Sequence, residues 1–292
     1  MEKTLTGKTY VVTGATSGIG LATAEALVQR GAGVIGIGRC EERCRQARHR
    51  LLSIDPDARV DYLMADLSLQ CQVRGLRTAI EASLHTQTQS EARLDGLVNN
   101  AGTFTYWLAL TPEGFEMQWA VNHLAPFLLT HELLPLLIAA PQARIVTVSS
   151  GSHYGGRLDW DDIQLRRNYN GLHAYENTKL ANVLFTLEFN RLMGPQYTVK
   201  AFAADPGLVK TDIGLKGTPG IVRWIWERRR AGGTKPQAPA DGIVYLLSEP
   251  GLQEATDFYW MGAKASPVSR LAQDPESARR LWAISERMCG IE

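Results

Sequence analysis

The chain has 292 residues, of which 45% are hydrophobic and 21% are charged, and its 31 lysines and arginines nearly balance 30 aspartates and glutamates. This composition is typical of a globular protein and excludes a disordered chain, a collagen-like repeat or a coiled coil as the main architecture. The net charge of +1 provides no cationic excess for binding phosphates, so no nucleic-acid partner is expected.

The four cysteines are too few for a disulfide scaffold, and none lies in a C-x-x-C pair, so neither a metal site nor dithiol chemistry is expected. The N-terminus enters a strand-like run without an apolar signal region. The most apolar stretch, 120–140, is interrupted by amide, histidine, glutamate and proline residues, whereas a membrane span needs about 20 nearly uninterrupted apolar residues. These features predict a soluble, cytoplasmic protein without a transmembrane anchor.

Short apolar runs alternate with longer helical patterns along the chain. The expected strands are rich in β-branched residues and cover 10–13, 34–38, 60–65, 94–99, 144–149 and 199–204. The expected helices cover roughly 18–30, 41–54, 69–88, 112–138, 174–193 and 274–288. This alternation favours an open, doubly wound parallel sheet with helices on both faces. No repeat or linker-like shift divides the chain, so a single α/β domain over 1–292 is predicted.

Two segments interrupt this alternation. Residues 151–173 have no clear periodicity and are interpreted as an insertion. Residues 212–238 are rich in glycine and proline and enclose the aromatic and basic stretch 221–230. We interpret this second segment as a substrate lid, with a helix lying on a membrane surface as the open alternative.

A glycine-rich turn, TGATSGIG, joins the first expected strand to the first expected helix, with glycines at 14, 18 and 20. Glycines in such a turn let the backbone approach a pyrophosphate, which the free N–H groups of the helix N-terminus attract. The spacing is G-x-x-x-G-x-G rather than the commoner G-x-G-x-x-G. A glycine-rich turn without a ligand therefore remains the alternative.

Tyr175 and Lys179 lie four positions apart at the start of an expected helix, so they share one face. A free tyrosine titrates near pH 10, and a nearby ammonium in a partly buried site lowers that pKa toward neutrality. This pair therefore suggests a tyrosine that transfers protons. A bare surface pair is the alternative.

Other polar residues stand where expected strands end or inside an apolar helix. Ser149 and Ser150 end the fifth strand, where an open sheet places its ligands and where a hydroxyl can donate to a carbonyl oxygen. Asn122 lies in an apolar helix, where an amide must be hydrogen-bonded. Residues 99–102, NNAG, suit a turn beside a ligand. Ordinary capping and turn roles remain open for all of them.

Taken in order, these motifs resemble the short-chain dehydrogenases/reductases: TGATSGIG, NNAG, the Asn of AVNHLAPF, the Ser of TVSSGSH, YENTK and Asp205-Pro206-Gly207. The resemblance covers about residues 5–290. It is closest to the retinol dehydrogenase-like branch, through NHLAPFLLTHELLPLL, YENTKLANVLFT and SPVSRLAQDPESARRLWAISERM. It implies a Rossmann-type fold of about seven strands and an oxidoreductase that acts on CH–OH or C=O groups.

The resemblance also implies roles for individual residues. Tyr175 would be the general acid/base, and Lys179 would lower its pKa and hold the nicotinamide ribose. Ser150 matches the position that polarises the substrate, and Asn122 would support a water relay to Lys179. The implied cofactor-binding residues are Gly14, Ser17, Gly18, Ile19, Gly20, Arg39, Asp66, Leu67, Asn100, Ala101, Gly102, Tyr175, Lys179, Pro206, Gly207, Val209 and Thr211.

The end of the second strand indicates NADP(H) rather than NAD(H). An acid there would bind the adenosine ribose in an NAD enzyme, whereas an arginine accommodates a 2′-phosphate. Gly38 stands at the position of that acid and Arg39 follows it. Arginine forms bidentate contacts with phosphate and stacks on adenine. A solvated arginine at a strand end is the alternative.

The substrate is expected to be a hydrophobic carbonyl compound or alcohol, because aromatic residues gather where it should lie: Phe104, Tyr106, Trp107, Tyr154, Trp224 and Trp226. Ordinary core packing is the alternative for each. The gap between Ser150 and Tyr175 is longer than is usual in the superfamily. The ending typical of tetrameric members is replaced by residues 258–262, which leaves a homodimer open. Membrane-bound relatives often carry an apolar N-terminal anchor that is not seen in this sequence, so an activity on retinoids is not carried over.

The sequence thus predicts an NADP(H)-dependent oxidoreductase with Tyr175 as its general acid/base. One rival is a non-catalytic NADP(H)-sensing or regulatory protein on the same scaffold. Another is a serine hydrolase that uses Ser150 with His153, although the chain lacks a G-x-S-x-G elbow at that serine.

Overall fold

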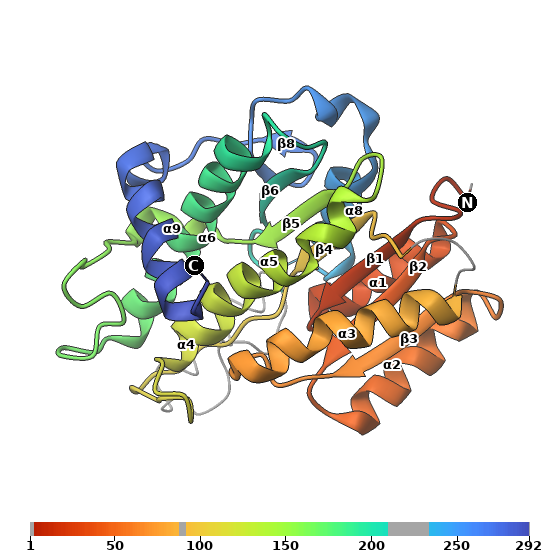
Figure 1. The fold of residues 1–292 in the computed structure, drawn as a ribbon, viewed down its shortest axis with the longest axis horizontal. Helices are drawn as coiled ribbons and strands as arrows, with labels where there is room; N and C mark the ends of the chain where they lie inside the picture. The colour runs from red at the N-terminus through yellow and green to blue at the C-terminus, as the bar shows by residue number, and fades with distance from the viewer. Residues whose placement is uncertain (1–2, 88–91, 210–233, 292) are drawn as a thin grey trace.

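The strands form one mostly parallel sheet. The computed structural model describes residues 3–87, 92–209 and 234–291. In this part of the chain the sheet has eight strands in the order β3-β2-β1-β4-β5-β6-β7-β8, parallel except for β8. The strands are β1 Thr9–Thr13, β2 Gly33–Gly38, β3 Val60–Met64, β4 Gly96–Asn99, β5 Arg144–Val148, β6 Lys200–Asp205, β7 Tyr259–Met261 and β8 Lys264–Ala265. The parallel strands all end on one side, here called the carboxyl edge (Figure 1).

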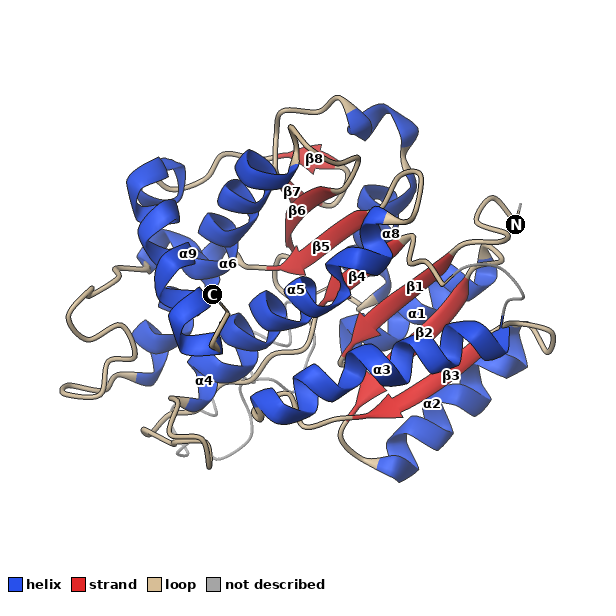
Figure 2. Ribbon diagram, viewed as in Figure 1, coloured by secondary structure: helices blue, strands red, loops and turns tan. Residues whose placement is uncertain are grey.

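Helices cover both faces of the sheet, as Figure 2 shows. The long helices are α1 Gly18–Gln29, α2 Glu41–Ile54, α3 Gln70–Gln87, α5 Ala125–Ile138, α6 Gly171–Met193, α8 Gln237–Ser248 and α9 Pro275–Cys289. The short ones are α4 Met117–Trp119, the π-helical turn η1 Ala120–Leu124, η2 Gly151–Gly155, η3 Pro250–Gln253 and η4 Leu271–Gln273. One core lies between the sheet and α3, α5, α6 and α9, and the other between the sheet and α1, α2 and α8.

Side chains alternate between these two cores along each strand. In β1, Val11 packs in the first core, whereas Tyr10 and Val12 pack in the second, and all three are fully buried. A strand buried on both faces is the expected consequence of helices on both sides of a parallel sheet. The doubly wound α/β fold is therefore confirmed.

The structure differs from the prediction in a few elements. The described residues contain eight strands rather than about seven, because the two-residue β8 pairs antiparallel with β7. Neither β7 nor β8 is among the six strands that the apolar runs predicted. The expected helix 112–138 begins at Met117 and includes the π-helical turn η1. The insertion 151–173 opens with η2 and ends in the first turn of α6. The proposed lid lies mostly outside the described residues, and its last two positions belong to α8.

The continuous helical stretch Met117–Ile138 has the length and apolar composition of a membrane span, with a mean hydropathy of 1.3 over its most apolar window. However, 67% of that window is buried inside the protein. Leu128 and Leu133 in this stretch are fully buried in the core with α3 and α6. A helix that is apolar because it fills a protein core has the same composition as a membrane helix.

Candidate active site

The glycine turn after β1 has the geometry that its sequence predicts. Gly14 and Gly18 adopt the left-handed conformation, with φ of +65° and +55°. A Cβ on Gly20 would lie 2.4 Å from the carbonyl oxygen of Gly14 and 2.4 Å from the side-chain nitrogen, Nδ2, of Asn100. Ser17 precedes α1 without a side-chain cap, and no acid stands in the first helical turn. The N–H groups of this helix end are thus uncapped by protein side chains, which suits a pyrophosphate.

Thr13 links the glycine turn to the turn after β4. Its hydroxyl accepts hydrogen bonds from the backbone N–H groups of Asn100 at 2.9 Å and Ala101 at 3.0 Å, and donates to the Val98 carbonyl at 3.2 Å. The Asn100 side chain donates to the Thr13 carbonyl at 2.8 Å. The role of Thr13 was not predicted from the sequence. Its position, at the end of a strand and directly before a glycine turn, was the available signal. The turn beginning at Asn100, with Gly102, is therefore held against the glycine turn.

The end of β2 has no room for an acid at position 38. A Cβ on Gly38 would lie 2.6 Å from Cγ2 of Thr16 and 2.7 Å from the sulfur of Cys44. Arg39 is exposed directly after the strand. Arg43, also exposed, lies four positions later in α2, and in the described part of the chain no carboxylate pairs with either guanidinium. The spacing of these two arginines was visible in the sequence, but Arg43 was not singled out.

Asp66 and Leu67 follow β3 at the same carboxyl edge. The Asp66 carboxylate accepts a hydrogen bond from the backbone N–H of Ser68 at 2.9 Å, and its own N–H donates to the side chain of Gln72 at 2.7 Å. Leu67 is partly buried and packs against the core beneath α3. The structure thus uses Asp66 to shape the turn into α3, while leaving both residues beside the end of the strand.

Tyr175 and Lys179 lie together in a buried part of α6. The ammonium of Lys179 is 5.3 Å from the centre of the Tyr175 ring and donates to the Val148 carbonyl at 3.0 Å. Only 9% of Tyr175 and 4% of Lys179 are exposed. The ring of Phe104 packs edge-on against Tyr175, with centroids 5.9 Å apart. The surface-pair alternative is therefore excluded.

Burial dominates the titration of this pair. It raises the pKa of Tyr175 above its usual value, and the carboxylate of Asp205 raises that pKa further. Burial lowers the pKa of Lys179 to about 8, and Asp205 opposes that change. Removing water disfavours whichever form is charged, so the tyrosine pKa rises while the lysine pKa falls. At neutral pH the pair is therefore a neutral phenol beside an ammonium, and the expected lowering of the Tyr175 pKa by Lys179 is wrong for this structure, because burial outweighs it.

The two serines after β5 have different roles. The hydroxyl of Ser149 is fully buried and donates to the backbone carbonyl of Lys179 at 2.9 Å. The hydroxyl of Ser150 is partly exposed, caps η2 by accepting from the N–H of Ser152 at 3.2 Å, and lies 3.3 Å from the Ser152 hydroxyl. Of the two, Ser150 therefore offers the hydroxyl that a ligand can reach.

His153 does not form a catalytic pair with Ser150. Its Nε2 accepts from the backbone N–H of Ser269 at 3.1 Å, so Nδ1 carries the proton and donates to the Ser150 carbonyl at 2.9 Å. Burial lowers the pKa of this fully buried ring. Both nitrogens are occupied by backbone groups, which argues against a serine hydrolase.

Asn122 lies in the π-helical turn η1 and holds the loop that follows β4. Its side chain accepts from the N–H of Thr103 at 2.7 Å and donates to the Thr103 carbonyl at 2.9 Å. It also donates to the Thr178 hydroxyl, 3.2 Å away in α6. These bonds leave its side chain fully engaged with protein, and no direct bond joins it to Lys179 among the described residues.

The insertion is fastened to the loop before α4 by a polar cluster that sequence analysis missed. The hydroxyl of Tyr169 donates to the buried carboxylate of Glu116 at 2.9 Å and lies 2.9 Å from the hydroxyl of Thr105. The side-chain amide of Gln118 donates to the same Tyr169 oxygen at 2.9 Å. This cluster holds the insertion beside the loop that carries Phe104. The contacts join distant segments, so sequence spacing could not reveal them.

The turn after β6 completes the carboxyl edge. Gly207 has a φ of +67°, and its N–H donates to the Asp205 carboxylate at 2.9 Å. Pro206 is partly buried between them. Val209 pairs with Thr234 in a parallel bridge. Thr211 lies outside the described residues.

The aromatic residues expected around the substrate are only partly assembled. Phe104 faces Tyr175, and Tyr106 packs edge-on against Trp107 at 4.8 Å between centroids, leaving Trp107 68% exposed. The Tyr154 hydroxyl donates to the Pro267 carbonyl at 2.7 Å. The other two expected residues, Trp224 and Trp226, lie outside the described residues.

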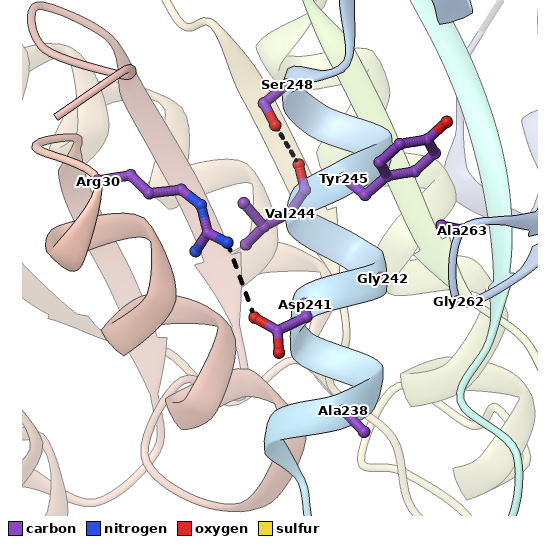
Figure 3. A pocket seen from close by; sticks show the side chains of 9 residues that line it. All are labelled: Arg30, Ala238, Asp241, Gly242, Val244, Tyr245, Ser248, Gly262 and Ala263. Carbon is purple, nitrogen blue, oxygen red and sulfur yellow. Dashed lines mark hydrogen bonds and ion pairs between the residues drawn. The ribbon is translucent and has the colours of Figure 1, made fainter. Parts of the chain in front are cut away.

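A separate surface pocket of about 410 Å³ lies between α1, α8 and the turn after β7 (Figure 3). Arg30 and Asp241 face each other across it at 3.8 Å, and Gly262 borders it. None of the residues expected at the site lines this pocket. Among the described residues, no group of three or more histidine, cysteine, aspartate or glutamate residues is arranged to hold a metal ion.

A family model described as short chain dehydrogenase matches residues 8–219. The chain is 36% identical to retinol dehydrogenase 14 of Homo sapiens, over 98% of this chain and 87% of that protein. It is 38% identical to dehydrogenase/reductase SDR family member 13 of Homo sapiens, over 98% of this chain and 74% of that protein.

Solved structures show the same likeness. A protein of unassigned function from Mycobacterium paratuberculosis is 31% identical, with a TM-score of 0.74 over 98% of this chain and 95% of that one. Angucycline C-6 ketoreductase LanV, solved with bound NADP, is 28% identical, with a TM-score of 0.72 over 90% of this chain and 96% of that one. The chain therefore belongs to the short-chain dehydrogenase/reductase superfamily, in its retinol dehydrogenase-like branch, and is an oxidoreductase of the kind that acts on CH–OH and C=O groups.

Proposed function

We propose that the protein interconverts a hydrophobic ketone or aldehyde with its alcohol, using NADP(H) and Tyr175 as general acid/base. The observation that carries this proposal is the buried pair of Tyr175 and Lys179, with the ammonium 5.3 Å from the ring centre. This pair lies at the carboxyl edge of the sheet, where the glycine turn also opens. Open α/β sheets bind their ligands at that edge.

The residues at this edge fit a dinucleotide. The close approach of Gly20 to Gly14 and Asn100 leaves no space for side chains under the turn, and the N-terminus of α1 is uncapped. Gly14, Ser17, Gly18, Ile19 and Gly20 would hold the pyrophosphate, and the turns beginning at Asn100 and Pro206 would flank the nicotinamide. When bound, the nicotinamide of NADP(H) supplies or accepts the hydride.

A preference for NADP(H) is supported by the end of β2. Position 38 has no room for the acid that would bind a 2′-hydroxyl, since a Cβ there would lie 2.6 Å from Thr16 and 2.7 Å from Cys44. Arg39 and Arg43 present two unpaired guanidinium groups in the described part of the chain. Arginines bind phosphate through paired N–H donors. Bound NADP in the related ketoreductase LanV points the same way.

The chain's own residues would move one proton. Ser150 and Tyr175 would donate hydrogen bonds to the substrate oxygen, which polarises the carbonyl. Burial raises the pKa of Tyr175, so its phenol holds the proton at neutral pH. The substrate oxygen becomes alkoxide-like as the carbonyl is reduced, and this more basic oxygen would take the proton from the phenol. The ammonium of Lys179 would then stabilise the phenolate that remains. Phe104 and Tyr106 would form apolar walls for the substrate.

The proposal is tested in two steps. Fluorescence titration compares NADPH with NADH, and we expect NADPH to bind more tightly. A panel of aldehydes and ketones of increasing apolar size is then tested for NADPH oxidation. NADPH binding without turnover on any compound would favour the sensing protein, and a failure to bind either cofactor would contradict both interpretations.

A further inference from the structure

A buried carboxylate lies next to the candidate catalytic pair. Asp205 is the last residue of β6 and is only 6% exposed. One of its oxygens accepts from the hydroxyl of Tyr259 at 2.8 Å, and the other accepts from the N–H of Gly207 at 2.9 Å. A Cβ on Gly151, directly after Ser150, would lie 3.4 Å from the oxygen that Tyr259 contacts. Both oxygens are thus held in place, close to the turn that carries Ser150.

Asp205 is also close to the strand position that anchors the Lys179 ammonium. Lys179 donates to the carbonyl of Val148, and Val148 pairs in register with Ala204, the residue before Asp205. Among the described residues the Lys179 ammonium bonds to the Val148 carbonyl and pairs with no carboxylate, while the charge of Asp205 raises the Lys179 pKa against the effect of burial. The Lys179 ammonium and the Asp205 carboxylate are thus both buried at the ends of the adjacent strands β5 and β6, and among the described residues they form no direct ion pair.

Burying an ammonium without a counter-charge is costly. We propose that Asp205 is a positioning residue for Lys179, whose buried carboxylate, fixed by Tyr259 and Gly207, is the counter-charge that keeps the Lys179 ammonium charged at the carboxyl edge. Its catalytic consequence rests on the proposed function, because a charged Lys179 is what stabilises the phenolate of Tyr175.

Among the described residues, the other titratable groups around Asp205 do not supply a competing cation. On α6 the neighbouring group is Tyr175, whose pKa Asp205 raises. On η2 it is His153, whose pKa is lowered by burial and whose two ring nitrogens are occupied by backbone groups. On β7 it is Tyr259, whose pKa is raised by burial and by Asp205, with a smaller contribution from Tyr154. In the part of the chain that the structure describes, Lys179 is therefore the cation that responds to the charge of Asp205.

The test measures Lys179 directly, without cofactor or substrate. The protein is labelled with ¹³C-lysine, the Lys179 signal is assigned from its loss in Lys179→Arg, and its titration is followed by NMR. In Asp205→Asn we expect the midpoint of the Lys179 titration to fall by about one pH unit. The variant removes a negative charge that favours the ammonium, and one nearby unit charge in a partly buried site has about that effect. Asp257→Asn, which removes an exposed carboxylate beside β7, should leave it unchanged.

A second readout tests the catalytic consequence. In the pH profile of kcat/KM for carbonyl reduction, the alkaline limb should move to lower pH in Asp205→Asn and stay in place in Asp257→Asn. A uniform rate loss at every pH with an unchanged Lys179 midpoint would mean a merely structural role and would overturn the proposal. Asp205→Ser, a smaller neutral replacement, provides the same comparison if Asp205→Asn does not fold. If the wild-type protein reduces no carbonyl compound, the proposed function fails while the NMR titration still decides this inference.

Discussion

The ammonium of Lys179 lies over the ring of Tyr175 at 5.3 Å and is held there by the Val148 carbonyl at 3.0 Å. The lysine is thus anchored to the sheet by a bond that does not depend on a ligand. A cation fixed in this position stabilises negative charge on the phenol without having to reorganise during the reaction. Because Lys179 stays anchored without the Tyr175 hydroxyl, removing that hydroxyl should impair turnover and leave the fold and cofactor binding unchanged.

Tyr175→Phe should abolish turnover while leaving NADPH binding nearly intact. The ring and its packing against Phe104 remain, whereas the proton donor is lost. Loss of a general acid/base typically slows a reaction by at least about 100-fold. Stopped-flow kinetics and fluorescence titration measure the two effects separately. Tyr197→Phe, which removes the hydroxyl of an exposed tyrosine that follows α6, is the control. Substantial turnover in Tyr175→Phe would refute the role assigned to that residue.

Arg39→Asp should weaken NADPH binding far more than NADH binding. The substitution replaces a phosphate-binding cation by an anion beside the expected 2′-phosphate, and we expect a change in preference of about tenfold or more. Arg45→Asp makes the same charge change on α2 at an arginine that pairs with Glu42, and should leave the preference unaltered. Equal losses for both cofactors in Arg39→Asp would contradict the assignment. Titrations of both proteins with both cofactors decide the matter.

Gly20→Ala should destabilise the fold and weaken NADPH binding. Its Cβ would lie 2.4 Å from the Gly14 carbonyl and from the Asn100 amide, so the glycine turn must shift. Overpacking of this kind costs about 1–3 kcal/mol. In contrast, Gly75→Ala lies in α3 with open space around it and should stabilise by about 0.5–1 kcal/mol. Urea unfolding of both variants is the measurement, and equal effects on stability would rule out crowding at position 20.

Tyr169→Phe should raise KM for large substrates more than it lowers kcat. It leaves the Glu116 carboxylate, which is 1% exposed, without one of its donors and loosens the insertion from Thr105. An unmade hydrogen bond at a buried charged group costs about 1–3 kcal/mol of stability. Steady-state kinetics with a small and a bulky substrate test this. An equal KM change for both would mean that the cluster does not shape the substrate region.

The free energy of unfolding should fall as the pH drops below about 6.5. Burial lowers the pKa of His123 to about 4 from an ordinary 6.5, so between these values the unfolded chain binds a proton that the folded protein does not. Above pH 6.5 the ring is neutral in both states and does not change the free energy of unfolding. Near pH 4 this free energy is about 3 kcal/mol lower than at neutral pH. His131 and His153 act in the same direction, because burial lowers their pKa values.

Urea unfolding at about pH 7 and about pH 4.5 measures this dependence. His123→Gln, which keeps a partner for the Ser285 hydroxyl now 2.8 Å from the ring, should reduce the pH dependence. His49→Gln, at an exposed position on α2, should not change it. The same slope in His123→Gln as in the wild type would exclude His123 as its source.

The sequence predicted the architecture wherever strands were long and apolar on both faces. It missed β7, because Tyr259–Met261 is too short to show a periodic pattern. It missed β8, because its two residues, Lys264 and Ala265, are exposed and carry no apolar signal. Helix α8 was hidden because its first residues were grouped with a glycine- and proline-rich segment. Local pattern is a weak signal for short elements whose stability comes from pairing with distant strands.

The site was predictable to the extent that spacing along one helix or strand placed its residues. The separation of Tyr175 and Lys179 implied a shared face, but their burial and the bond to Val148 depend on β5, which lies far away in the chain. The hydrogen bonds between Asn122 and Thr103 likewise depend on the packing of distant segments. The same holds for the position of the Asp205 carboxylate, which Tyr259 fixes. Such contacts leave no periodic trace in a single sequence.

The position of Asn122 at the site depends on the number of residues in the π-helical turn η1 as well as on their types. A regular α-helix turns by about 100° per residue, and a π turn accommodates one extra residue within an otherwise α-helical stretch. Deleting one residue from Ala120–Leu124 would restore a regular helix and rotate α4 and Asn122 by about that angle relative to α5. The core face of α5 would survive, but the amide would leave Thr103. Variants of this protein should therefore tolerate substitution in this turn more readily than a change in its number of residues.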